Sequence, residues 1–526
     1  MRQSASAAAI AALAAIAGAA LMAGRSAARP AEARGGPTLY PAPPGEPASP
    51  DYAVTVNGRP ASCYTSWRFD AESHTAIAGR PVSPITFCYF DLGEGGGAEI
   101  EVRLLDGLRH AGLDTARVTV RPLAHRICPR VRDGRVRFRV AKPCQLSLEP
   151  GGGLRHPLHI FVNPPERGAP RPGDPGVRYY GPGYHEASEV DLLSGETVYI
   201  AGGAIVSLRP TPSNKLGPGT LHEAYGVPVW WAPGLFGSQG RKRVTIRGRG
   251  ILCGRRGLEA HQRGHLLRVQ DVEDLTVEGI VIRESSVWSL NVVNCRRVRV
   301  SNVKIVGHYV NNDGIAIGGT SDALVEDCFS HNADDTMEVK VWIPQRNVTF
   351  RRCVVWNDVG GSLGLMHEAD ADIENVAYED CTVIHSTDDM SACPVAGLKL
   401  TGAGSARAFR FENIVIEDVV GPHRPSLKVI NNWDDWHMEH PRKRGSPYEL
   451  RDPPKRAKPS GAIRDVLFRN VRVLRARCPD VVLMADASQS PIEGVTFDNV
   501  TINGRRLAPG DRRIKTNSWV RGVTVR

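Results

Sequence analysis

Residues 298–305 read Val-Arg-Val-Ser-Asn-Val-Lys-Ile, one copy of an eight-residue pattern that recurs through the second half of this 526-residue chain. The pattern is apolar, any, apolar, polar, polar, apolar, any, apolar. The other copies begin at Val244, Leu275, Ala323, Val348, Val376, Phe409, Val466 and Val495. Successive copies start 23 to 33 residues apart, except for one interval of 57 residues. A structural repeat therefore runs through about half of the chain.

The pattern predicts a solenoid of short strands. Alternating apolar positions are typical of strands, and the polar step between them predicts a bend. Nine copies at such intervals indicate a parallel β-helix, in which each coil buries its apolar side chains against the next coil. Cys328, Cys353 and Cys381 occupy the sixth position of consecutive copies, so we expect an inward-facing stack of thiols. The predicted fold class is all-β, with an N-terminal β-sandwich followed by a right-handed parallel β-helix.

The chain divides into three parts. Residues 1–35 combine Arg2, an Ala-rich apolar run and small residues, which predicts a secretory signal peptide, with an uncleaved membrane anchor as the alternative. Residues 36–180 contain short strand-like runs between Gly and Pro turns, which predict a β-sandwich. Residues 181–526 form the predicted β-helix catalytic domain. We therefore expect a secreted or periplasmic protein that is not membrane-bound after cleavage of the signal.

The chain carries a formal net charge of +10 and eleven cysteines. A basic surface attracts acidic polymers, either uronic-acid polysaccharides or nucleic acid, but an ordinary solvated surface is the favoured explanation of the charge. The densest basic run, 241–256, has no interleaved aromatic residues for base stacking, so we expect no nucleic-acid partner. The sequence contains no Cys-x-x-Cys pair, so it does not predict a zinc site. Cys63 with Cys88 and Cys128 with Cys144 are candidate disulfides.

Two acidic clusters, Asn311-Asn312-Asp313-Gly314 and Asn332-Ala333-Asp334-Asp335, lie about one coil apart. Strands of neighbouring coils stack about 4.8 Å apart, so the three carboxylates are expected on one face. Inverting glycosidases hold an acid and a base about 6.5–9.5 Å apart, and crowded carboxylates raise one another's proton affinity. The spacing predicts glycosidic hydrolysis, while a hydrated acidic turn or a calcium site remains an alternative.

The run 286–295, the cluster ending at Gly314 and the run Asp334-Asp335-Thr-Met-Glu-Val-Lys340 together resemble the central coils of the polygalacturonase family. The related dextranase and isopullulanase family shares the three-aspartate arrangement and adds an N-terminal β-sandwich. This resemblance spans about residues 180–505 and implies a pectin-lyase-like solenoid with glycoside hydrolase activity. It implies that Asp334 is the general acid, while Asp313 and Asp335 hold and activate the attacking water.

We expect further residues of this half of the chain to bind the substrate: Asn311, Asn312, Trp288, Lys340, His367, Lys399, Trp433 and Trp436. The two last tryptophans lie in a loop inserted at about 421–461, where they either stack on sugar rings or pack the loop itself. Two departures from the polygalacturonase pattern concern the substrate. Val359 stands where that family carries a histidine, and the stretch around Lys399 lacks its arginine, which favours a neutral polymer.

The sequence thus predicts a secreted, monomeric, inverting glycoside hydrolase that binds a polysaccharide and needs no cofactor or metal. The expected substrate is a neutral α-glucan such as dextran, or pectic polygalacturonan. Two alternatives stay open. One is a calcium-dependent enzyme similar to pectate lyases, with the three aspartates as metal ligands. The other is a polysaccharide-binding solenoid without catalytic activity.

Overall fold

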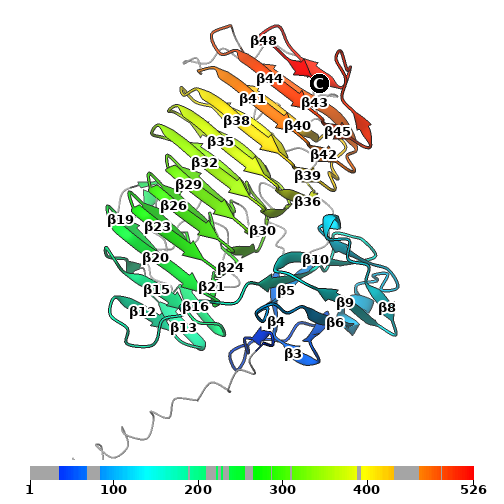
Figure 1. Ribbon diagram of the computed structural model, residues 1–526, viewed down its shortest axis with the longest axis vertical. Coiled ribbons are helices and arrows are strands. Elements are labelled where there is room, and N and C mark those ends of the chain that lie inside the picture. The colour runs from blue at the N-terminus through cyan, green and yellow to red at the C-terminus, as the bar shows by residue number, and fades with distance from the viewer. Residues whose placement is uncertain are drawn as a thin grey trace, which may run out of the picture.

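The computed structural model describes residues 35–67, 83–187, 190–208, 221–222, 227–228, 236–254, 265–285, 287–308, 311–387, 393–431, 461–486 and 488–526. This part of the chain is almost entirely β-structure (Figure 1). Its helical elements are the short helix α2 (Asp106–His110) and the 3-10 turn η1 (Leu123–His125). No helix in the described ranges is long and apolar enough to cross a membrane.

Three long parallel sheets form the C-terminal part of the molecule. The first sheet contains β12 (Val177–Tyr180), β15 (Thr197–Ile200), β20 (Lys242–Gly248), β23 (Glu273–Glu278), β26 (Arg296–Ser301), β29 (Ser321–Glu326), β32 (Gln345–Arg351), β35 (Ile373–Glu379), β38 (Ala406–Glu412), β41 (Ile463–Arg469), β44 (Ile492–Asp498), β48 (Val520–Arg521) and β49 (Thr524–Val525). The second sheet contains β13 (Gly183–Ala187), β16 (Ala204–Leu208), β21 (Ile251–Cys253), β24 (Val281–Arg283), β27 (Lys304–Val306), β30 (Phe329–Asn332), β33 (Val354–Asn357), β36 (Thr382–Ser386), β39 (Val415–Ile416), β42 (Arg472–Val473), β45 (Thr501–Ile502) and β46 (Arg505–Arg506). The third sheet contains β14 (Val190–Asp191), β19 (Phe236–Gln239), β22 (Leu267–Gln270), β25 (Leu290–Val293), β28 (Ile315–Gly318), β31 (Met337–Val341), β34 (Leu363–Ala369), β37 (Ala396–Thr401), β40 (Pro425–Asn431), β43 (Cys478–Ala485) and β47 (Ile514–Thr516).

The predicted parallel β-helix is confirmed, because each coil contributes one strand to each of the three sheets. In every copy of the sequence pattern the first half lies in the first sheet and the second half in the second sheet. The polar step between them bends the chain through the left-handed region, with φ of 54° at Asn302 and 55° at Asp327 and Asp380. Asn and Asp adopt this conformation more readily than most other residues.

Side chains of the same position stack from coil to coil inside the solenoid. Cys328, Cys353 and Cys381 are fully buried in the core, as the repeat predicted. An aromatic stack runs beside them, with ring centroids 4.8–5.3 Å apart, through Phe350, Tyr378, Phe411, Phe468 and Phe497. Each coil therefore completes the core of its neighbours.

The N-terminal part contains two further sheets, the first with both parallel and antiparallel pairs and the second entirely antiparallel. One holds β1 (Thr38–Leu39), β4 (Cys63–Trp67), β5 (Pro84–Asp91), β7 (Val118–Arg121), β10 (Cys144–Pro150) and β11 (Leu158–Asn163). The other holds β2 (Tyr52–Val56), β3 (Arg59–Ala61), β6 (Ala98–Leu104), β8 (Arg130–Arg132) and β9 (Arg135–Val140). Apolar side chains of both sheets form one buried cluster, so the two sheets pack over a shared core.

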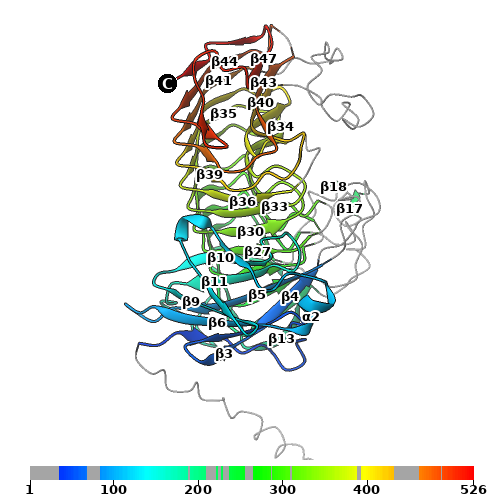
Figure 2. The same cartoon turned by 90° about the vertical axis from the view of Figure 1, so that its right-hand side faces the viewer.

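This N-terminal domain packs against the second sheet of the β-helix (Figure 2). Phe87 and Phe161 of the domain share an apolar cluster with Phe329 and Trp356 of the solenoid. A buried ion pair also crosses the boundary, with Arg249 Nε 2.9 Å from a carboxylate oxygen of Asp91. The two domains are therefore joined by an apolar contact that contains paired charges.

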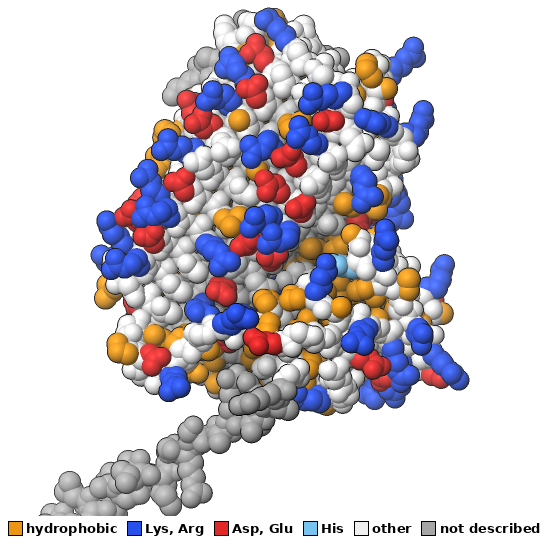
Figure 3. All heavy atoms as spheres, in the orientation of Figure 1, with side chains coloured by type: hydrophobic (Ala, Val, Ile, Leu, Met, Phe, Trp, Pro, Cys, Tyr) orange, Lys and Arg blue, Asp and Glu red, His pale blue; other side chains and the backbone are white. Residues whose placement is uncertain are grey.

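The two predicted disulfides are wrong, because all eleven cysteines are free thiols. Cys63 and Cys88 lie directly opposite each other on β4 and β5, but Cys128 is exposed on a loop and Cys144 begins β10. Basic and acidic side chains alternate over the face in Figure 3, so the positive charge is dispersed there. Residues 1–34 of the predicted signal peptide, and Trp433 and Trp436, lie outside the described residues.

Candidate active site

The two acidic clusters meet at the entrance to neighbouring strands of the third sheet. Strands β28 and β31 pair in parallel with Ile315 opposite Met337, so Asp313 lies beside Asp335, two positions earlier in each coil. The amide of Gly314 donates to the carbonyl oxygen of Asp335 at 2.7 Å and fixes this register. Oxygen atoms of Asp313, Asp335 and Glu338 all lie within 4.8 Å of one another.

Asparagine side chains hold the backbone that presents the aspartates. Asn332 Nδ2 donates to the carbonyl oxygens of Asp334 at 2.7 Å and Asp335 at 3.1 Å. Asn357, one coil further on, donates to the same Asp334 carbonyl at 2.7 Å. Asn312 is fully buried and its Oδ1 accepts from the amide of Ala333 at 2.8 Å. The side chain of Asn312 thus supports the turn that carries the next cluster.

Gly360 and Gly361 lie in the turn before β34, on the coil that follows the one with Asp334 and Asp335. The amide of Gly361 donates to Asp335 Oδ1 at 2.6 Å. A Cβ atom on Gly360 would lie 2.4 Å from the Asp335 nitrogen and 2.7 Å from Asp334 Oδ1, so only glycine fits there. The buried guanidinium of Arg424 donates to the carbonyl oxygens of Val359, at 3.1 Å, and of Gly360. Val359 stands where the polygalacturonase pattern has a histidine. In this structure that position belongs to a glycine turn whose carbonyl oxygens are bound by Arg424.

Lys340 is the central cation of the site. In β31 the side chains of Met337, Val339 and Val341 enter the core, so Glu338 and Lys340 point to the opposite face of the sheet. Lys340 Nζ lies 3.6 Å from Asp335 Oδ2 and 3.1 Å from Glu338 Oε2. It also pairs with the half-exposed Glu368 at 2.9 Å and stands 5.0 Å from the ring centroid of Trp288.

Burial and mutual repulsion hold protons on the carboxyl groups. Burial, followed by the neighbouring charge of Asp335, raises the pKa of Asp334 from 3.8 to about 7. Burial, followed by the charge of Glu338, raises the pKa of Asp313 well above its ordinary value. Burial also raises the pKa of Glu338 to about 8 against the opposing effect of Lys340. The cluster thus retains protons at neutral pH that isolated carboxylates would lose.

Further predicted residues lie along the same sheet. His367 Nε2 is 2.8 Å from Cys393 Sγ. Its pKa is lowered well below the ordinary value by burial and then by the charges of Lys399, Lys340 and Lys428. Lys399 is fully buried on β37, in register with Met366 of β34, and Asn311 is half-buried in the turn before Asp313. A group of lysines therefore adjoins the carboxyl cluster.

A model of Glycosyl hydrolases family 28 matches residues 239–423, about a third of the chain, and this range contains the whole carboxyl cluster. The resemblance to the polygalacturonase and dextranase clan is confirmed. Polygalacturonase QRT2 of Arabidopsis thaliana is 23% identical over 235 residues, which cover 44% of this chain and 48% of that protein. Probable polygalacturonase At3g15720 of the same plant is 24% identical over 159 residues, 30% of this chain and 34% of that protein.

The chain therefore spans between a third and a half of the length of these curated relatives. Among solved structures, Dex49A from Penicillium minioluteum superposes with a TM-score of 0.59. The superposition covers 93% of this chain and 96% of that chain, at 13% sequence identity. This likeness to a member of the clan concerns the fold, and it includes the N-terminal domain because nearly the whole chain is covered.

Residues of the site that were not predicted from the sequence include Glu338, Arg424 and Lys428. The clan resemblance carries no role for Glu338, although strand alternation with Lys340 would have placed both on one face. Arg424 and Lys428 lie just before and within β40, on the next coil but one after the glycine turn. No local pattern distinguishes them from surface charges, so only the stacking of coils brings them to the site.

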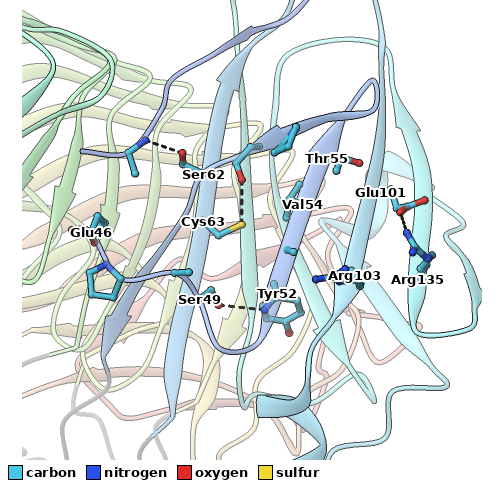
Figure 4. A pocket seen from close by; sticks show the side chains of 16 residues that line it. Glu46, Ser49, Tyr52, Val54, Thr55, Ser62, Cys63, Glu101, Arg103 and Arg135 are labelled. Carbon is cyan, nitrogen blue, oxygen red and sulfur yellow. Dashed lines mark hydrogen bonds and ion pairs between the residues drawn. The ribbon is translucent and has the colours of Figure 1, made fainter. Parts of the chain in front are cut away.

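Among the described residues, two places offer three potential metal ligands within 4.8 Å of one another. They are Asp335 with His367 and Cys393, and Asp313 with Asp335 and Glu338. Lys340 already supplies a positive charge to both Asp335 and Glu338. A separate cavity of about 400 Å³ lies in the N-terminal domain, lined by side chains such as Tyr52, Cys63, Glu101 and Arg135 (Figure 4). None of the clustered carboxyl groups lines this cavity, so the candidate active site is the one on the third sheet.

Proposed function

We propose that this protein hydrolyses glycosidic bonds of a polysaccharide with inversion of configuration. The observation that carries the proposal is the set of carboxyl groups that neighbouring coils bring to one point of the third sheet. Those of Asp313, Asp335 and Glu338 have oxygen atoms within 4.8 Å of one another, and burial raises the pKa of the adjoining Asp334 to about 7. An inverting glycosidase requires one protonated carboxyl to donate to the leaving oxygen and one carboxylate to activate water.

In this proposal Asp334 is the general acid. Its pKa of about 7, raised first by burial and then by Asp335, keeps a proton available at the pH where most hydrolases work. The amide of Asp335 donates to Asp334 Oδ1 at 2.9 Å, which orients the carboxyl and leaves the other oxygen to carry the proton. That proton passes to the glycosidic oxygen as the bond from the anomeric carbon to this oxygen breaks.

Asp313 and Asp335 hold and activate the attacking water. Both are largely buried and lie side by side at the start of β28 and β31. Asp335 Oδ1 accepts from the Gly361 amide, and its Oδ2 lies 3.6 Å from the Lys340 ammonium, so both oxygens have a positively polarised neighbour. The water loses a proton to a carboxylate while its oxygen bonds to the anomeric carbon.

The sequence favours a neutral α-glucan such as dextran, because the arginine of the polygalacturonase pattern is missing next to Lys399. The charges of Lys340, Lys399 and Lys428 around His367 favour a second candidate, an acidic polymer such as polygalacturonate. We also propose that the protein is exported, since residues 1–35 have the composition of a secretory signal peptide.

A substrate comparison tests these proposals. Purified protein is incubated with dextran, pullulan or polygalacturonate, with and without a chelator, and reducing ends and ultraviolet-absorbing unsaturated products are measured. Hydrolysis releases reducing ends without ultraviolet absorbance, and the product anomer seen first by NMR is the inverted one. Asp334→Asn keeps the fold but lowers turnover by at least ~10³-fold, in line with loss of an acid catalyst and its positioned proton. Unsaturated products lost on chelation would instead support the lyase alternative.

A further inference from the structure

Glu338 is the fully buried member of the carboxyl cluster. It lies in the middle of β31, and its register neighbours are Ala316 of β28 and Gly364 of β34. Because both neighbours are small, the Glu338 carboxyl has room to approach Asp313 and Asp335. The Glu338 side chain is fully buried, so it reaches the substrate only through these groups.

The charges around Glu338 do not balance. The single ammonium of Lys340 lies within 3.6 Å of three carboxyl groups, those of Asp335, Glu338 and Glu368. Asp335 has the additional amide donor of Gly361. Asp313 has no ion pair with any described residue, and its buried Oδ1 has no hydrogen-bond partner there. A buried carboxylate without a cation is costly, so Asp313 is the weakest anion of the cluster.

We propose that Glu338 is a positioning residue that shares one proton with Asp313, so that Asp313 meets the attacking water as a neutral carboxyl and Asp335 is the ionised base. The inference rests on the proposed hydrolysis and assigns different tasks to the two water-facing aspartates. Asp335 takes the proton of the water, the water oxygen bonds to the anomeric carbon, and the proton of Asp334 leaves with the departing oxygen. Asp313 hydrogen-bonds the water and its own protonation does not change.

The groups facing this pair support the shared proton. Asp313 is surrounded by Glu338, Asp334, Asp335 and Lys340, of which only Lys340 is positive. Glu338 faces Lys340, Asp335 and Asp313, so it competes with two carboxyl groups for the same ammonium. Two adjacent buried carboxyl groups with less than one full counter-charge retain a proton between them, as paired carboxylates do in other enzymes.

Three isosteric variants test the assignment. Asp313→Asn resembles the neutral carboxyl and keeps kcat within about 10-fold of wild type, whereas Asp335→Asn removes the base and lowers kcat by at least ~10³-fold. Activity is followed on whichever of dextran or polygalacturonate the wild type cleaves. Glu374→Gln, at an exposed ion pair on β35, is the matched control and leaves kcat unchanged. An equal loss in Asp313→Asn and Asp335→Asn would overturn the proposal.

A second readout does not depend on turnover. Infrared difference spectra at pH 7 lose a protonated-carboxyl band in Asp313→Asn and a carboxylate band in Asp335→Asn. Glu338→Gln removes the neighbouring acid, so Asp313 ionises and its protonated band is lost there too. If Asp313→Asn instead loses a carboxylate band, the shared proton is refuted. If the wild type cleaves neither polymer, the proposed function fails while these spectra still decide the protonation of the pair.

Discussion

Replacing Gly360 by alanine tests whether the close approach of two coils positions Asp334, the proposed general acid. The new Cβ would lie 2.4 Å from the Asp335 nitrogen, 1.0 Å inside the 3.4 Å at which ordinary contact begins. It would lie 2.7 Å from Asp334 Oδ1, 0.7 Å inside the same limit. The turn behind Gly360 is held by Arg424, so the aspartates are the groups that yield. A misplacement of about 1 Å at a reacting group can cost about 100-fold in rate.

We therefore expect Gly360→Ala to lower kcat by about 100-fold and the free energy of unfolding by about 1–3 kcal/mol, the usual range for overpacking. Release of reducing ends measures the first effect and urea denaturation the second. Gly153→Ala is the matched control, because a Cβ there would have only the Pro150 carbonyl oxygen nearby, at 3.8 Å. If Gly360→Ala has the kcat of wild type, Asp334 is not positioned by this contact.

Three more predictions concern charge. Activity falls as the pH rises through about 7, because burial and Asp335 raise the pKa of Asp334 to that value and the ionised form has no proton to donate. A rate that stays level to pH ~9 would exclude Asp334 as the acid. Lys340→Met leaves carboxyl groups buried without their cation and lowers the free energy of unfolding by about 3–5 kcal/mol in urea denaturation. Arg249→Met leaves the buried Asp91 carboxylate without its cation at the domain boundary and lowers the free energy of unfolding by about 3–5 kcal/mol. An added Asp91→Leu substitution partly restores the stability. Unchanged stability in the single variant would show that the pair contributes nothing.

The fold was largely predictable because its signal is repeated. Nine copies of one pattern predicted the parallel β-helix, and their polar step predicted the bend that the structure places at the left-handed residues Asn302 and Asp327. The third sheet was not marked by the pattern, since its strands differ from coil to coil. That sheet carries the site, where side chains such as Glu338 and Lys340 serve chemistry and depart from the repeat.

The candidate site was predictable only in part, for a geometric reason. Asp313 and Asp335 are 22 positions apart, close to the length of a coil, so a count along the sequence was enough to stack them. Arg424 lies 64 positions beyond Gly360, and the intervening coils have unequal lengths. The candidate disulfides were wrong as well: Cys128 is exposed on a loop away from the start of β10, and Cys63 and Cys88 are free thiols although they lie opposite each other on β4 and β5.

The N-terminal domain also supports the site, through a buried chain of hydrogen bonds. His159 Nε2 of that domain lies 2.9 Å from His331 Nδ1 on β30, and His331 Nε2 lies 3.1 Å from Asp358 Oδ2. The amide of Asp358 donates to the Asn332 carbonyl oxygen at 3.0 Å, and Asn332 in turn holds the backbone of Asp334. Since these hydrogen bonds and the apolar contact at the second sheet lie on the opposite side of the same coils, we expect the domain to stabilise the turn that presents Asp334. The N-terminal domain is therefore linked to the backbone of Asp334 through the opposite side of the coil.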